Sequence, residues 1–156
     1  MTYTEYRESE QSWFDVLPIF FAFGKNQLEE QLKKRGFDDY EEGIKNIYRF
    51  GDTGGFYLKS DAEKIREWCN RPNKLPELMK NEKFAVEAFE YEMENHEYAI
   101  NYYQGDWDVC SCFCKCEYTD DKTWREYLKE GGYDDTVLGY FLKALKKYNK
   151  KSANWY

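Results

Sequence analysis

Several motifs and segments are missing from this 156-residue chain, and each absence excludes a class of protein. The chain has a single histidine, His96, which excludes the His-Glu-x-x-His zinc motif. It has no P-loop and no Ser, His and Asp set in the order of a known hydrolase. No apolar run approaches the roughly 18 residues of a membrane-spanning helix, and no charged-then-apolar leader opens the sequence. We therefore expect no membrane association and no cofactor.

Charge and cysteine content indicate a compartment and a kind of partner. The net charge of −7 argues against binding to a phosphate backbone, so we do not expect a nucleic acid partner. The same negative charge is compatible with binding to a basic protein. Five cysteines without a leader indicate reduced thiols rather than a disulfide framework, so we expect a cytoplasmic protein. The sequence leaves the oligomeric state open.

The chain is rich in aromatic residues, which make up 20% of it and supply large buried areas. Two of its three prolines lie in residues 70–76, the one candidate for an internal linker, which is too short to separate two stable domains. We therefore predict a single compact α+β domain over residues 1–156, with a helical C-terminal part over residues 117–150. The domain would contain a mainly antiparallel sheet of about five strands with helices packed on it.

Five short segments have the composition or the alternation of strands. Two of them flank the glycine-rich segment 51–55, which predicts a hairpin turn rather than a phosphate loop because no Gly-Lys-Ser/Thr follows it. Two others flank Gln104-Gly105, which predicts a second hairpin. The five expected strands are Ile19–Phe23, Ile44–Phe50, Phe56–Leu58, Tyr98–Tyr103 and Trp107–Phe113.

Residues 81–96 have the 3.6-residue period of a helix, and its apolar face carries two ionisable side chains. Glu92 and His96 fall on that face with Ala85 and Phe89, one turn apart, so their side chains can meet. A carboxylate in this position can fix the tautomer of the imidazole, raise its pKa, or share a metal ion with it. The alternative is a partly buried, hydrogen-bonded pair at a helix end.

Four cysteines alternate along the second strand of this expected hairpin, at positions 110, 112, 114 and 116, and would share its second face. Alternate residues of one strand are about 6.6–6.8 Å apart, so a zinc ion at about 2.3 Å from each sulfur can bridge two of them at most. The sequence also has no Cys-x-x-Cys knuckle. A half-buried strand face lined with thiols is therefore favoured over a metal or redox role, which stays open.

Two segments resemble a family of small acidic proteins from phages and bacterial mobile elements. Phe20–Glu30, an apolar strand followed by a polar helix, is similar to the opening of that family. Glu92–Tyr98 resembles its Glu-x-x-Asn-His-Glu-Tyr signature, and Gly54-Gly55-Phe56 resembles a glycine turn between the two. The resemblance spans about residues 19–103. It implies no activity, because that family is uncharacterised, but it suggests a mobile-element setting and groups Asn95 and Glu97 with the Glu92–His96 pair.

These observations leave two main hypotheses of function and a third, purely structural reading of the Glu92–His96 pair. The favoured one is a non-enzymatic accessory protein that binds a host or element-encoded protein, because exposed Tyr and Trp beside carboxylates suit a basic partner. The alternative is an enzyme or metal-binding protein. No catalytic residue is assigned; its acid–base candidates are Glu92, His96, Asp106 and Asp108, and its metal-ligand candidates are Glu92, His96, Cys110 and Cys112.

Overall fold

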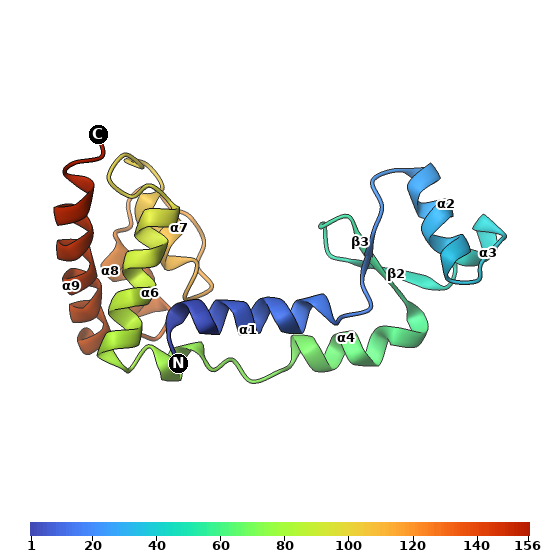
Figure 1. Cartoon of the computed structure of the whole chain (residues 1–156), viewed down its shortest axis with the longest axis horizontal. Helices are drawn as coiled ribbons and strands as arrows, with labels where there is room; N and C mark the ends of the chain where they lie inside the picture. The colour runs from blue at the N-terminus through green and yellow to red at the C-terminus, as the bar shows by residue number, and fades with distance from the viewer. The chain divides into compact units, whose positions relative to one another are not determined.

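The computed structural model describes residues 1–156, which form two compact units (Figure 1). The terminal unit consists of residues 1–8 and 73–156, and the inserted unit consists of residues 9–72. Helix α1, Tyr3–Asp15, begins in the terminal unit and ends in the inserted one. The boundary at residue 73 falls within the expected linker 70–76. That the whole chain behaves as one domain stays a prediction.

The inserted unit is built on a small antiparallel sheet with strand order β1-β3-β2. Phe20 of β1 pairs with Phe56 of β3, and Tyr48 of β2 pairs with Tyr57 of β3. The expected hairpin at residues 51–55 is confirmed, since it joins β2 to β3. The elements of this unit are β1 Phe20–Phe21, α2 Lys25–Lys34, α3 Tyr40–Ile44, β2 Ile47–Phe50, β3 Gly55–Leu58, a 3-10 turn Lys59–Asp61 and α4 Ala62–Cys69.

The β2–β3 turn depends on Gly54, which has a positive φ of 78°. A Cβ at this position would also overlap the ring of Phe23. We expect Gly54→Ala to lower the free energy of unfolding by about 1–2 kcal/mol, because an L side chain is strained in the left-handed region. Urea denaturation measures the change, and Gly139→Ala, in an open helical position, is the control. Equal unfolding midpoints for the two variants would contradict this role of the turn.

The terminal unit is helical, and α6 and α9 lie side by side in it (Figure 1). Asn81 caps α6 by accepting a hydrogen bond from the N–H of Phe84, and Asp134 caps α9 in the same way. Phe89 of α6 packs edge-on against Phe141 of α9, with ring centroids 5.0 Å apart. The helices of this unit besides α1 are α5 Leu75–Leu78, α6 Glu82–Asn95, α7 Gly105–Cys110, α8 Trp124–Glu130 and α9 Asp135–Ser152.

The predicted sheet of about five strands is wrong. The sheet has three strands, and helices hold 56% of the residues, so the fold is a mostly helical α+β fold. The apolar run Ile19–Phe23 forms a strand of only two residues, and that strand lies at an edge of the sheet. No helix of the structure combines the length and the apolar character that crossing a membrane requires.

The second expected hairpin is also wrong, because turns and the short helix α7 replace it. The spacing of the apolar residues here fits both a strand and a helix. Val109 and Phe113 are four residues apart, so they lie on one side of a strand, but the same spacing also places them on one face of a helix. Tertiary contacts select the helix. Val109 and Cys110 are both fully buried, and Asp106 accepts hydrogen bonds from the Tyr98 hydroxyl and the Trp124 N–H. The four cysteines therefore do not share a strand face.

Candidate functional site

Helix α6 carries the expected pair of ionisable side chains at its C-terminal end. Its apolar residues Ala85, Phe89 and Met93 are fully buried, and this face draws Glu92 into the interior, where only 3% of the residue is exposed. His96 is the C-cap residue, and its side chain is 30% exposed. The structure places His96 Nε2 3.4 Å from Glu92 Oε2.

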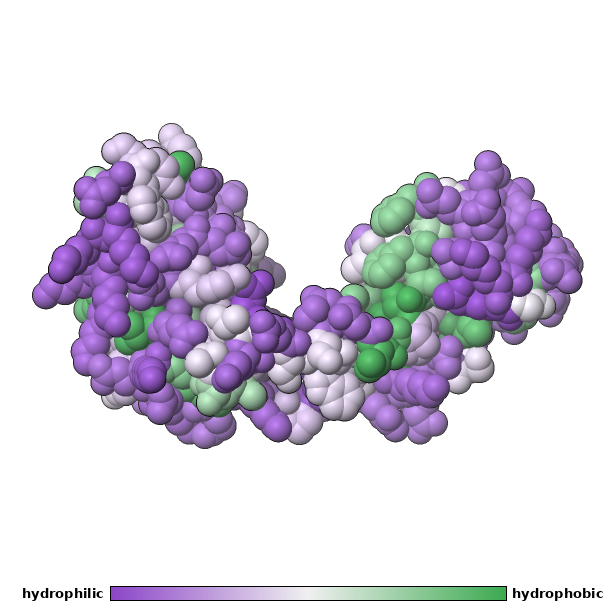
Figure 2. Space-filling model, viewed as in Figure 1, coloured by the Kyte–Doolittle hydropathy of each residue, from purple (hydrophilic) through white to green (hydrophobic).

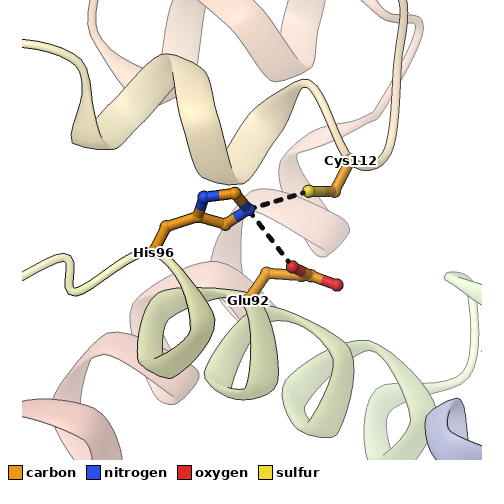
Figure 3. A group of neighbouring side chains, drawn as sticks. All are labelled: Glu92, His96 and Cys112. Atoms are coloured by element: carbon orange, nitrogen blue, oxygen red, sulfur yellow. Dashed lines mark hydrogen bonds and ion pairs between the residues drawn. The ribbon is translucent and has the colours of Figure 1, made fainter. Parts of the chain in front are cut away.

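A third side chain, that of Cys112, meets this pair from the segment after α7 (Figure 3). Its Sγ lies 3.5 Å from His96 Nε2, and the ligand atoms of Glu92, His96 and Cys112 all lie within 4.8 Å of one another. This metal-ligand cluster, as we call it, contains three of the four metal-ligand candidates of the sequence. The cluster forms because the helical turn brings Cys112 back towards α6, which an extended strand would not do.

The remaining candidates lie outside the metal-ligand cluster and have other partners. Cys110 is fully buried, and its thiol donates to the carbonyl of Trp124 at 3.7 Å. Asp106 accepts from Tyr98 and from the backbone of Trp124, and Asp108 accepts from the side chain of Asn101 at 2.7 Å. The geometry therefore favours Cys112 over Cys110 as a ligand and gives neither aspartate a place beside the histidine.

Two neighbours hold the buried carboxylate in place. The hydroxyl of Tyr3 donates to Glu92 Oε1 at 2.7 Å, and the side chain of Asn95 donates to Oε2 at 3.2 Å. Burial and the bond to Glu92 raise the pKa of Tyr3 above its ordinary value, so its proton stays available for this bond. Sequence reasoning grouped Asn95 with the pair but missed Tyr3, because 89 residues separate it from Glu92 and no local pattern links them.

The environment of Cys112 favours the protonated thiol. Burial, followed by the negative charge of Glu92, raises the pKa of this thiol to about 12, against a weaker opposing effect of Arg7. The thiol donates to the carbonyl of Asp108 at 3.3 Å. A nucleophilic cysteine needs a lowered pKa, so this thiol is not activated for covalent catalysis. A bound cation would reverse the balance, because a coordinating thiol loses its proton.

The arrangement of His96 distinguishes coordination from a catalytic triad. In a triad, the two ring nitrogens serve different partners, one the nucleophile and the other the carboxylate. Here the same nitrogen, Nε2, faces both Cys112 and Glu92, while Nδ1 lies on the other side of the ring (Figure 3). Three donor atoms that converge on one point are the arrangement of metal ligands rather than of a proton relay.

Two separations within the metal-ligand cluster, both from His96 Nε2, fit the edges of a tetrahedral metal site. Zinc bonds of about 2.0–2.1 Å to N and O and about 2.3 Å to S give tetrahedral edges of roughly 3.3 Å between N and O and roughly 3.5 Å between N and S. The observed separations are 3.4 Å and 3.5 Å. A thiolate, an imidazole and a carboxylate together suit zinc better than magnesium or calcium, which prefer oxygen ligands. Three protein ligands would leave a fourth position for water.

Comparison with known proteins places the chain in a family without assigning it a reaction. The model of a family of unknown function (DUF7659) matches residues 2–110. No curated protein and no solved structure matches the chain. The matched segment includes Tyr3, Glu92 and His96 but ends before Cys112. The family match therefore covers two of the three residues of the metal-ligand cluster.

Proposed function

This chain belongs to the DUF7659 family, and we propose that it binds one zinc ion through Glu92, His96 and Cys112. The observation that carries the proposal is the convergence of three different ligand atoms within 4.8 Å, two of them facing a single imidazole nitrogen. The burial of the Glu92 side chain supports it further, because ionisable groups in the interior are normally paired or bound to a metal ion.

The role that fits this geometry best is structural. The ligands come from the end of α6 and from the segment after α7, and Tyr3 connects α1 to Glu92. A zinc ion would therefore tie the end of α6 to the segment after α7, and Tyr3 would join α1 to it through Glu92. Its fourth position would be open to water, whereas most structural zinc sites fill it with a fourth protein ligand.

The metal content of protein purified without an affinity tag tests the proposal. We expect one zinc per chain, lost on substituting Cys112→Ser or His96→Ala and kept in Cys69→Ser, which changes an exposed thiol of the inserted unit. Cobalt substitution adds a spectroscopic test, because a cobalt–thiolate bond gives a charge-transfer absorption that a histidine–carboxylate site lacks. Metal-free protein that also takes up no added zinc or cobalt would overturn the proposal.

Removing the Tyr3 hydroxyl tests whether its hydrogen bond holds the Glu92 carboxylate in place, and it leaves the three proposed zinc ligands unchanged. We expect Tyr3→Phe to lower the free energy of unfolding by about 1.5–3 kcal/mol, because it leaves one oxygen of a buried carboxylate without a donor. Tyr140→Phe is the matched control, since Tyr140 also packs against the core and no hydrogen bond to its hydroxyl is found. Equal stability of the two variants in guanidinium denaturation would contradict a supporting role for Tyr3.

A second candidate function is a cytoplasmic accessory protein of a phage or mobile element that binds a host or element-encoded protein. Figure 2 shows a hydrophobic area on the visible face of the inserted unit. In this unit Val16 is 73% exposed and Phe23 is 75% exposed, and exposed apolar residues of this kind serve as anchors at interfaces. The net charge of −7 favours a basic partner.

Crosslinking in the native host tests the accessory role. We expect a defined protein adduct that is lost in Phe23→Ser and kept in Trp155→Ser, a change to an exposed aromatic residue of the terminal unit. Identical adducts from both variants would contradict a role for the hydrophobic area. The positions of related genes beside phage or mobile-element genes would test the proposed setting.

A further inference from the structure

A hollow rich in tyrosine lies in the terminal unit, outside the metal-ligand cluster. It has a volume of about 290 Å³. Tyr102 and Tyr103, both among the residues that line it, are 83% and 89% exposed, so they contribute little to the core. Exposing two adjacent aromatic side chains to water is unfavourable in free energy, and packing in the core does not explain why they lie here.

Two aromatic rings that line the hollow, those of Trp107 and Tyr118, are held in fixed orientations. The indole N–H of Trp107 donates to the carbonyl of Cys116 at 2.9 Å, which fixes its ring. The ring of Tyr118 stands nearly perpendicular to it, at 72° with centroids 6.0 Å apart. The Tyr118 hydroxyl donates to the carbonyl of Tyr103 at 3.3 Å, which ties the rim to this wall.

The charges around the hollow favour a positively charged group. Asp106 and Asp120 line it. Asp106 is held by neutral donors, the Tyr98 hydroxyl and the Trp124 N–H, and neither aspartate forms an ion pair in the structure. The one cation of the wall, Lys122, pairs with Glu130 at 2.9 Å. Its ammonium lies 6.0 Å from the centroid of the Tyr127 ring.

We propose that this hollow binds an alkylated ammonium group, such as the side chain of a methylated lysine on a partner protein. The faces of Trp and Tyr rings attract such cations, and the attraction is largest for a weakly hydrated quaternary ammonium, which loses little hydration on entry. The aspartates add a longer-range attraction. The inference is independent of the metal site and of the hydrophobic area on the inserted unit, because it uses none of their residues.

The test compares a cation with its neutral analogue. Nα-acetyl-trimethyllysine methylamide is titrated into the full chain and followed by the Trp107 indole signal in NMR spectra, beside the isosteric analogue in which carbon replaces the charged nitrogen. We expect the cation to bind at least about tenfold more tightly than the analogue, because the two differ only in charge. Equal affinity of the two probes, or no shift with either, would overturn the proposal.

Variants on the rim locate the binding without disturbing the fold. We expect Tyr103→Ala and Asp120→Asn each to weaken binding of the cation by about threefold to tenfold, since each removes one source of attraction. Tyr156→Ala, which changes a tyrosine that is 65% exposed and does not line the hollow, is the matched control. Unchanged affinity in both rim variants would place the probe elsewhere and refute the assignment. Zinc content measured on the same samples keeps this result separate from the metal proposal.

Discussion

Adding zinc to the metal-free protein is expected to stabilise it by about 4 kcal/mol when free zinc is about 1,000 times the dissociation constant. The gain follows from mass action, because the three ligands converge only when the terminal unit is folded. Chemical denaturation with and without a chelator measures it, followed by circular dichroism. We expect Cys112→Ser to lose most of this gain and Cys69→Ser to keep all of it.

The pH dependence of zinc binding is a second readout of the same prediction. The thiol of Cys112, with its pKa raised to about 12, is protonated at neutral pH and must lose its proton to bind the metal. Zinc affinity should therefore rise about tenfold per pH unit between pH 7 and pH 9, with one proton released by Cys112 for each zinc bound. Calorimetry in two buffers of different ionisation enthalpy counts that proton.

The metal-free protein should show the opposite trend with pH. Since the pKa of Cys112 is higher in the folded chain than the ordinary value of 9.0, the folded state holds this proton more tightly than the unfolded state. The resulting stability is complete below about pH 9 and is lost as the pH rises towards 12.

The zinc-bound protein gives the contradicting outcome. If the stabilisation by zinc falls as the pH rises from 7 to 9, Cys112 does not bind the metal as a thiolate.

The part of the site on α6 could be predicted because helical periodicity is a local property. Glu92 and His96 are four residues apart on a face that also carries Ala85 and Phe89, and a helix brings such residues together whatever surrounds it. The position of Cys112 depends instead on how residues 98–116 fold. Its alternating pattern fitted a strand, but the burial of Val109 and Cys110 and the contacts of Asp106 stabilise a helical turn.

The sheet was overestimated for a related reason. Aromatic and β-branched residues were interpreted as strand formers, yet in this chain many of the aromatic ones pack between helices. Phe113 and Phe141, for example, contact Phe89 of α6 at 4.8 Å and 5.0 Å between ring centroids. The β2–β3 hairpin was predicted correctly because its glycines specify the turn directly, without reference to distant residues. The contact between Tyr3 and Glu92 has no local signal of any kind.

Truncating the buried carboxylate is expected to be the most destabilising change in the metal-ligand cluster. We expect Glu92→Ala to lower the free energy of unfolding of the metal-free protein by about 2–4 kcal/mol, because it opens a cavity and leaves the buried Tyr3 hydroxyl without an acceptor. It should also abolish zinc binding. Guanidinium denaturation and metal analysis of the same preparation measure both effects.

Glu92→Gln separates the shape of this side chain from its charge. The amide oxygen of glutamine can still accept from the Tyr3 hydroxyl, so we expect the metal-free variant to retain most of the stability that Glu92→Ala loses. The neutral amide is a poor zinc ligand, and the zinc affinity should fall by at least about 100-fold. If Glu92→Gln instead binds zinc as the unmodified chain does, Glu92 is only a hydrogen-bonded core residue. In that case Glu92 is not a zinc ligand, and the assignment of the site to Glu92, His96 and Cys112 together is refuted.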